Sequence, residues 1–73
     1  MRNSLKVLRA GRDWSQAAVA TRAGVSRQAI NAVETGKFDP SLPLAMKLAR
    51  LFNTTVEDIF SMDGDNPEEP ISL

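Results

Sequence analysis

The segment 26–36, "SRQAINAVETG", brings together side chains that suit specific hydrogen bonding. On a helix Arg27 and Asn31 lie one turn apart, and Gln28 lies beside them on the same face. Arginine can donate two hydrogen bonds to O6 and N7 of guanine, and glutamine or asparagine can pair in a bidentate way with adenine. Ala32 is small enough to contact a thymine methyl group. These residues suit a helix that reads base edges in DNA, but they equally suit the ordinary polar face of an exposed helix.

Most residue types that carry enzyme chemistry are missing from the chain. It contains no cysteine, histidine or tyrosine, so it has no thiolate nucleophile, no imidazole base and few of the ligands that zinc prefers. The acidic pairs Glu57–Asp58 and Glu68–Glu69 are sequence neighbours and therefore do not face each other on a helix. The stretch "DGDN" is followed by Pro67, where a calcium loop needs a ligand. We predict that the chain is not an enzyme and holds no metal or cofactor.

The charged residues are segregated along the chain, although its formal net charge is zero. Residues 1–50 hold all nine lysines and arginines and three acids, a net charge of +6. Residues 51–73 hold six acids and no base, a net charge of −6. This asymmetry predicts a basic surface on the first part of the chain, suited to nucleic acid, and an acidic C-terminal part.

The length of 73 residues is enough for one small domain with a thin core, for which dimerisation is a common means of stabilisation. The sequence has no apolar stretch long enough to span a bilayer, and its N-terminus lacks the apolar region of a signal peptide. We therefore expect a soluble, cytoplasmic protein that does not interact with membranes.

Five helices are expected from the helix-breaking and capping residues. The expected segments are residues 4–11, 16–22, 27–35, 42–52 and 56–60. The residues Ser15, Ser26, Ser41 and Thr55 precede four of these segments, and each can accept a hydrogen bond from the first helical turn. Gly24 permits the positive φ that a tight link between two helices often demands. The alternation typical of a strand is absent from the sequence, which predicts an all-α chain.

Two short helices joined by a tight glycine-containing turn, the second with its first residues exposed, form a helix-turn-helix. The segment of about residues 16–35 fits this motif. The residues that match it are Gln16, Ala20, Gly24, Val25, Ile30 and Val33. With "ETGK", "PSLPLAMKLARLF" and "TTVEDIF", they resemble the Xre/Cro family of phage-repressor-like regulators over roughly residues 4–60. The resemblance implies a compact, five-helix DNA-binding domain over residues 1–61, with the helix-turn-helix formed by the second and third helices. Residues 62–73 would follow as an acidic, flexible tail.

The resemblance also implies roles for individual residues. The third helix would read DNA bases, whereas the start of the second helix would contact phosphates. The implied base-reading residues are Arg27, Gln28, Asn31 and Ala32, and the implied phosphate contacts are Ser15, Gln16 and Lys37. Arg9 of the first helix and Glu34 of the third would form a structural ion pair. Trp14 stands where the family usually has leucine, and we expect it to pack between the first two helices.

We predict a sequence-specific transcriptional regulator, with repression as the expected effect, that binds a palindromic operator in double-stranded DNA as a homodimer. The surfaces left for the dimer contact are the loop around Phe38, the outer side of the fourth helix and the fifth helix. Phe60 and Met62 are the predicted contact residues, with packing inside its own chain as the alternative for Phe60. The alternative is an antitoxin-like module that silences a partner protein through the acidic segment 57–69 and autoregulates its own operator. Co-purification of such a partner from the native cell would separate the two interpretations.

Overall fold

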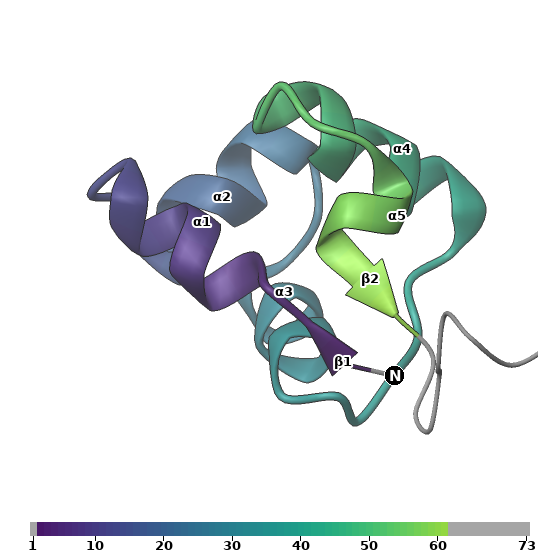
Figure 1. Cartoon of the computed structure of the whole chain (residues 1–73). Coiled ribbons are helices and arrows are strands. Elements are labelled where there is room, and N and C mark those ends of the chain that lie inside the picture. Colours follow the sequence, from purple (N-terminus) through teal and green to yellow (C-terminus); the bar gives the residue numbers. More distant parts are fainter. Residues whose placement is uncertain (1, 62–73) are drawn as a thin grey trace, which may run out of the picture.

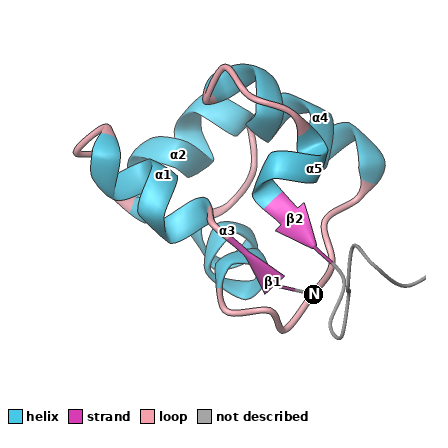
Figure 2. Cartoon of the chain, viewed as in Figure 1, coloured by secondary structure: helices cyan, strands magenta, loops and turns pink. Residues whose placement is uncertain are grey.

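Five helices and one short sheet make up residues 2–61, the part of the chain that the computed structural model describes (Figure 1). In chain order the elements are β1 (Arg2–Asn3), α1 (Leu5–Gly11), α2 (Gln16–Ala23), α3 (Arg27–Glu34), α4 (Leu42–Leu51), α5 (Val56–Ile59) and β2 (Phe60–Ser61). Each helix begins and ends within one residue of the segment expected from the sequence. The prediction of a helical, five-helix domain is confirmed, and Figure 2 shows how small the share of strand is.

The expected capping residues stabilise the starts of four helices. The side-chain oxygens of Ser15, Ser26, Ser41 and Thr55 each accept a hydrogen bond from the backbone N–H three residues further on, at 3.0 to 3.2 Å. Each of these bonds satisfies an N–H of the first turn that has no partner within its own helix. The starts of α2 and α3 are therefore set by their own sequence.

The link between α2 and α3 depends on Gly24. Its φ of 72° lies in the left-handed region, where a residue with a Cβ is strained. Directly after it, the Val25 N–H donates to the carbonyl oxygen of Ala20 at 3.0 Å, which closes the end of α2. This tight closure lets α3 begin at Arg27, in the arrangement of a helix-turn-helix.

The core is formed by one face of each helix. Its largest fully buried side chains are Leu5, Val19, Ile30, Leu48 and Ile59, one from each of α1 to α5. The helix α2 packs against both α3 and α4. Because Ile30 and Val33 of α3 are 0% and 4% exposed, rotation of α3 would bring apolar surface into water. The core therefore fixes which face of α3 points outward.

A two-stranded antiparallel sheet, which the sequence did not indicate, adds to the helical fold. Arg2 lies opposite Ser61 and Asn3 lies opposite Phe60, and in Figure 1 the two strands lie side by side near the N-terminus. Strands of two residues are too short to show an alternating pattern, and their pairing joins the two ends of the described chain. The Asn3 Nδ2 atom also donates to the Val33 carbonyl oxygen at 2.9 Å, so this sheet is tied to the end of α3.

Candidate nucleic-acid interface

The outward face of α3 carries three polar side chains. Arg27, Gln28 and Asn31 are all exposed, on the side of α3 that points away from the buried Val33. Because Arg27 and Gln28, the first residues of α3, are exposed, they can enter a groove of a binding partner without any change in the core. The surface is rich in hydrogen-bond donors and acceptors of the kind that base edges require.

Ala32 is less accessible than these three residues. It is half-buried, and its carbonyl oxygen accepts hydrogen bonds from the N–H groups of Lys37 and Phe38 at 2.9 and 3.2 Å. These bonds hold the chain close to α3 after the helix ends. The part of Ala32 that remains accessible is small, so it offers a contact of limited area at the edge of the polar face.

Gln16 of α2 joins the polar face of α3. It lines a surface hollow together with Arg27, Gln28 and Asn31. The Asn31 Nδ2 atom donates to Gln16 Oε1 at 3.4 Å, a long hydrogen bond between the two helices. The sequence assigned these four residues to bases and to phosphates separately, and the structure places them on one continuous surface.

Two further residues expected to contact phosphates lie at the surface. Ser15 is exposed, and its oxygen already accepts from the Ala18 N–H at 3.0 Å. Its hydroxyl proton is still available for donation, and the first N–H groups of α2 beside it lack helical partners. Lys37 is exposed in the turn after α3. The two residues lie directly before α2 and shortly after α3, at the two ends of the helix-turn-helix.

Arg9 and Glu34 form the ion pair that was expected, and it is bidentate. The Nη2 atom of Arg9 lies 2.8 Å from Oε1 of Glu34, and its Nε atom donates to Oε2 at 3.1 Å. The third bond of this guanidinium runs from Nη1 to the carbonyl oxygen of Trp14 at 3.0 Å. The pair therefore connects α1, the end of α3 and the turn before α2.

Burial makes this ion pair matter for stability. The side chains of Arg9 and Glu34 are only 18% and 6% exposed. The hydrogen bonds from Arg9 lower the pKa of the Glu34 carboxyl, against the opposing effect of burial, and Gln16 and Lys6 add smaller favourable effects. The same hydrogen bonds raise the pKa of Arg9. The charged form of Glu34 is thus favoured in the folded chain relative to the unfolded chain.

The pH dependence of folding should follow from the lowered pKa of Glu34. The stabilisation of the folded chain by ionised Glu34 is fully present above the pKa of an unfolded glutamate, about 4.3. It is lost as the pH falls through the lower pKa that Glu34 has in the folded chain. We expect the free energy of unfolding of the wild type to fall in this acidic range and that of Glu34→Gln to fall less. Urea titrations followed by circular dichroism at a series of pH values measure this. The matched control is Glu57→Gln, at an exposed position of α5, and parallel profiles for Glu34→Gln and the wild type would contradict the assignment.

Trp14 makes contacts that the sequence did not indicate. It is partly buried against the core, and the centroid of its ring lies 5.5 Å from that of Phe52 at the end of α4, a contact beyond the first two helices between which it was expected to pack. The guanidinium carbon of Arg22 lies 4.3 Å from the centroid of Trp14, and that of Arg12 lies 5.3 Å from it. Two arginines thus stack on one partly buried aromatic side chain. In the sequence, the presence of a tryptophan at position 14 is the one signal of such a contact.

The two residues predicted for a dimer contact differ in what the structure says of them. Phe60 lies in β2 and not in the last helix, and it is 8% exposed within the core of the single chain. Met62 lies outside the described residues. A contact between two chains at these positions stays a prediction, and the structure shows that most of the Phe60 surface is used within one chain.

The tight link after α2 and the exposed polar face of α3 define a helix-turn-helix protein. Residues 5–59 match the HTH_3 helix-turn-helix family, and this range contains all five helices. The chain therefore belongs to this family, as the sequence motifs indicated.

Proteins similar to this chain are described as regulators of the same helix-turn-helix type. The chain is 49% identical over 65 residues to an uncharacterized HTH-type transcriptional regulator of Methanocaldococcus jannaschii, an alignment that covers 89% of this chain and 98% of that protein. It is 48% identical over 65 residues to a protein of the same description in Archaeoglobus fulgidus, covering 89% and 92% of the two chains. The protein YgzD of Bacillus subtilis, also described in this way, is 39% identical over 66 residues, covering 90% and 100%.

The chain is thus a DNA-binding transcriptional regulator of the helix-turn-helix type and not an enzyme. Within residues 2–61, no helix combines the length and the apolar character that crossing a membrane requires.

Proposed function

We propose that this regulator is a repressor that binds a palindromic operator as a homodimer and reads the major groove with α3. The observation that carries the proposal is the single polar surface formed by Arg27, Gln28, Asn31 and Gln16 over the buried side of α3. Arg27, Gln28 and Asn31 are exposed on α3, whose orientation is fixed by the core, and the half-buried Gln16 joins them from α2.

The chemistry of this surface suits a division between base and phosphate contacts. Arg27 can donate two hydrogen bonds to guanine, and Gln28 or Asn31 can pair with adenine. Gln16, at the start of α2, would contact a phosphate, where the partial positive charge of the helix terminus adds to the attraction. In this arrangement the hydrogen bond between Gln16 and Asn31 would help to hold α3 in register with the backbone contact.

A dimer on a palindrome follows from the small size of this reading surface. One short helix covers only a few base pairs, which is too little information for a unique genomic site. Two copies related by a two-fold axis would read two half-sites about one turn of DNA apart, roughly 34 Å. Such a dimer would cover the duplex between and around its half-sites. Its simplest effect would be to exclude other proteins from that DNA, which would repress transcription.

Selection of bound duplexes from a random pool tests the proposal. The expected result is an enriched inverted repeat whose half-site centres are about one DNA turn apart. A transcription assay with this repeat placed over a promoter then tests repression. Recovery of sequences without any shared motif would contradict specific reading, and recovery of a single unrepeated motif would contradict the dimer.

Loss of the Lys37 side chain should weaken binding to all sequences alike. Lys37 is exposed just after α3, and a phosphate contact by a lysine releases counterions without reading bases. We expect Lys37→Ala to reduce the slope of log K against log salt by about one per bound chain and to leave the base preference unchanged. Lys47→Ala, a lysine substitution on α4, is the matched control. A changed base preference in Lys37→Ala would refute the phosphate assignment.

A further inference from the structure

A positively charged hollow lies where the C-terminal parts of α2 and α4 come together. The residues that line it, which we call the basic hollow, are Arg22, Ala23, Gly24, Lys47, Arg50 and Leu51. Its arginines and lysine are all exposed. Neither α2 nor α4 contains an aspartate or a glutamate, and within residues 2–61 no carboxylate forms an ion pair with any of these three cations. The positive charge of the hollow is therefore not balanced by any acid on its own two helices.

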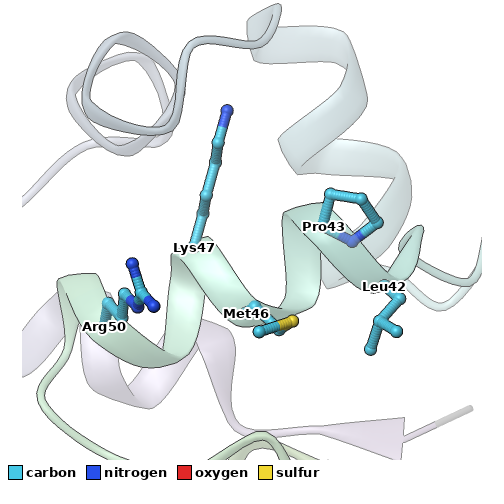
Figure 3. Close-up of a pocket in the computed structure, with 5 residues that line it drawn as sticks. All are labelled: Leu42, Pro43, Met46, Lys47 and Arg50. Atoms are coloured by element: carbon cyan, nitrogen blue, oxygen red, sulfur yellow. The ribbon is translucent and has the colours of Figure 1, made fainter.

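The cations of the basic hollow are directed outward and can accept an anionic ligand. Lys47 and Arg50 are three residues apart and share one side of α4. In Figure 3, Lys47 extends well away from α4, on a different side of the helix from Met46. Arg22 donates one hydrogen bond, from Nη1 to the carbonyl oxygen of Ala18 at 3.1 Å, which uses one of the five N–H donors of a guanidinium.

The basic hollow is separate from the polar surface of α3. Gln16, at the start of α2, belongs to that polar surface, whereas Arg22 lies at the other end of α2, about 9 Å further along the helix axis. In Figure 1, α3 lies below α2 and α4 lies above it and to the right. The two surfaces have no lining residue in common. Arg27 is the one cation of the polar surface, so an acidic ligand is attracted more strongly to the three cations of the basic hollow.

We propose that the basic hollow binds the C-terminal segment of the same chain, residues 62–73, and so keeps the acids of this segment away from DNA bound at α3. The segment holds four acids and no base, a net charge of −4 that is opposite in sign to the charge of the hollow. The contact lies within one chain and does not depend on how α3 reads bases.

The length and the starting point of the C-terminal segment allow this contact. The segment follows Ser61, the last residue of β2, and α5, which precedes β2, packs against α4. Its twelve residues can extend over about 40 Å, and the longest dimension of the structure is 37 Å. The acids can therefore reach the basic hollow from the end of β2.

The contact should be strong enough to form within one chain and sensitive to salt. A single exposed ion pair contributes little to binding. Several pairs form together here, however, and the connection through the chain keeps the segment at a high effective concentration near the hollow. The Debye length falls from about 10 Å at 0.1 M salt to about 3 Å at 1 M salt, so we expect the contact at the lower salt concentration and its loss at the higher one.

A nitroxide label on the segment locates the contact without any DNA. The chain has no cysteine, so Asn66→Cys provides a single attachment point between the two acidic pairs. At about 0.1 M salt, the label should broaden the amide NMR signals of Gly24 and Leu51 much more than those of Gln28 and Asn31, and this difference should vanish at about 1 M salt. Broadening that is equal at the two surfaces, or stronger at Gln28 and Asn31, would overturn the proposal.

Two double charge reversals in the labelled chain test the role of the cations. Lys47→Glu with Arg50→Glu should abolish the broadening at the hollow. The matched control is Arg27→Glu with Lys37→Glu, which reverses two exposed cations on the side of α3 and should leave the broadening unchanged. Persistence of the broadening after reversal of the hollow, or its loss in the control, would contradict binding by the hollow.

Neutralisation of the segment gives a test that leaves the folded residues 2–61 unaltered. The four substitutions are Asp63→Asn, Asp65→Asn, Glu68→Gln and Glu69→Gln. In the labelled chain they should also abolish the broadening at the hollow. Broadening that survives these substitutions would show that charge does not hold the segment, and the proposal would be wrong.

Binding to a duplex of unrelated sequence tests the consequence for DNA and needs no base reading. Lys47→Glu with Arg50→Glu would release the acidic segment, whose charge then repels the phosphates. At about 0.1 M salt, this reversal should weaken binding at least about threefold more in the chain with the native segment than in the chain with the neutralised segment. Equal losses in the two chains would mean that the hollow acts on DNA directly, and would overturn its role of keeping the segment away.

Discussion

Glu34→Ala should destabilise the folded chain by about 3 kcal/mol, the lower end of the range for breaking a buried ion pair. The substitution would leave the guanidinium of Arg9 in a site that is only 18% exposed, with its bond to the Trp14 carbonyl oxygen as its remaining contact. For a domain of this length the total stability is about 4–11 kcal/mol, so the loss is a large share of it. Urea denaturation followed by circular dichroism measures the change.

Two further variants separate the ion pair from other effects of the substitution. Glu57→Ala, at an exposed glutamate of α5, should change the free energy of unfolding by less than about 0.5 kcal/mol. The double variant Arg9→Met with Glu34→Leu removes both charges and should recover most of the stability, because no buried charge is left without a partner. A double variant as unstable as the sum of its single variants would show that Arg9 and Glu34 contribute independently.

Arg27→Ala and Gln28→Ala should each weaken binding to the selected operator by about 1–3 kcal/mol per bound chain. Both side chains are exposed on α3 and line the hollow shared with Gln16, so their removal leaves the core intact. Binding to a duplex of unrelated sequence should change little, since phosphate contacts supply most of that affinity. Fluorescence anisotropy with the two duplexes at a fixed salt concentration measures both effects.

The control for the lost charge is Arg50→Ala, another exposed arginine, at the far end of α4. It should reduce the affinity for the two duplexes to the same small extent. Equal losses on both duplexes for Arg27→Ala would make Arg27 a phosphate contact and not a base contact.

Local sequence signals account for most of the fold and for the orientation of the site. The N-caps at Ser15 and Ser26 and the glycine at position 24 act within a few residues of their own position, and all three behave in the structure as expected. The polar and apolar faces of α3 follow from the helical period alone, because Ile30 and Val33 must share the buried side.

Features that depend on distant residues could not be predicted from such signals. The pairing of Asn3 with Phe60 joins the two ends of the described chain, and the hydrogen bond between Gln16 and Asn31 depends on how α2 and α3 pack. The exposure of Leu42 and Met46 also depends on tertiary packing, since the apolar residues of α4 cover more than one side of the helix. The acidic segment on which the antitoxin-like interpretation depends lies mostly outside the described residues, and that interpretation stays a prediction.

The most direct test of reading by α3 pairs a protein variant with a change of a single DNA atom. In duplexes carrying the selected operator, each guanine is replaced in turn by an analogue in which a carbon takes the place of N7, which removes one major-groove acceptor and preserves base pairing. For at least one guanine in each half-site, we expect the replacement to weaken wild-type binding about tenfold and to have no further effect on Arg27→Ala. A wild type that is insensitive to every replacement, or an Arg27→Ala variant as sensitive as the wild type, would contradict base reading by Arg27 of α3.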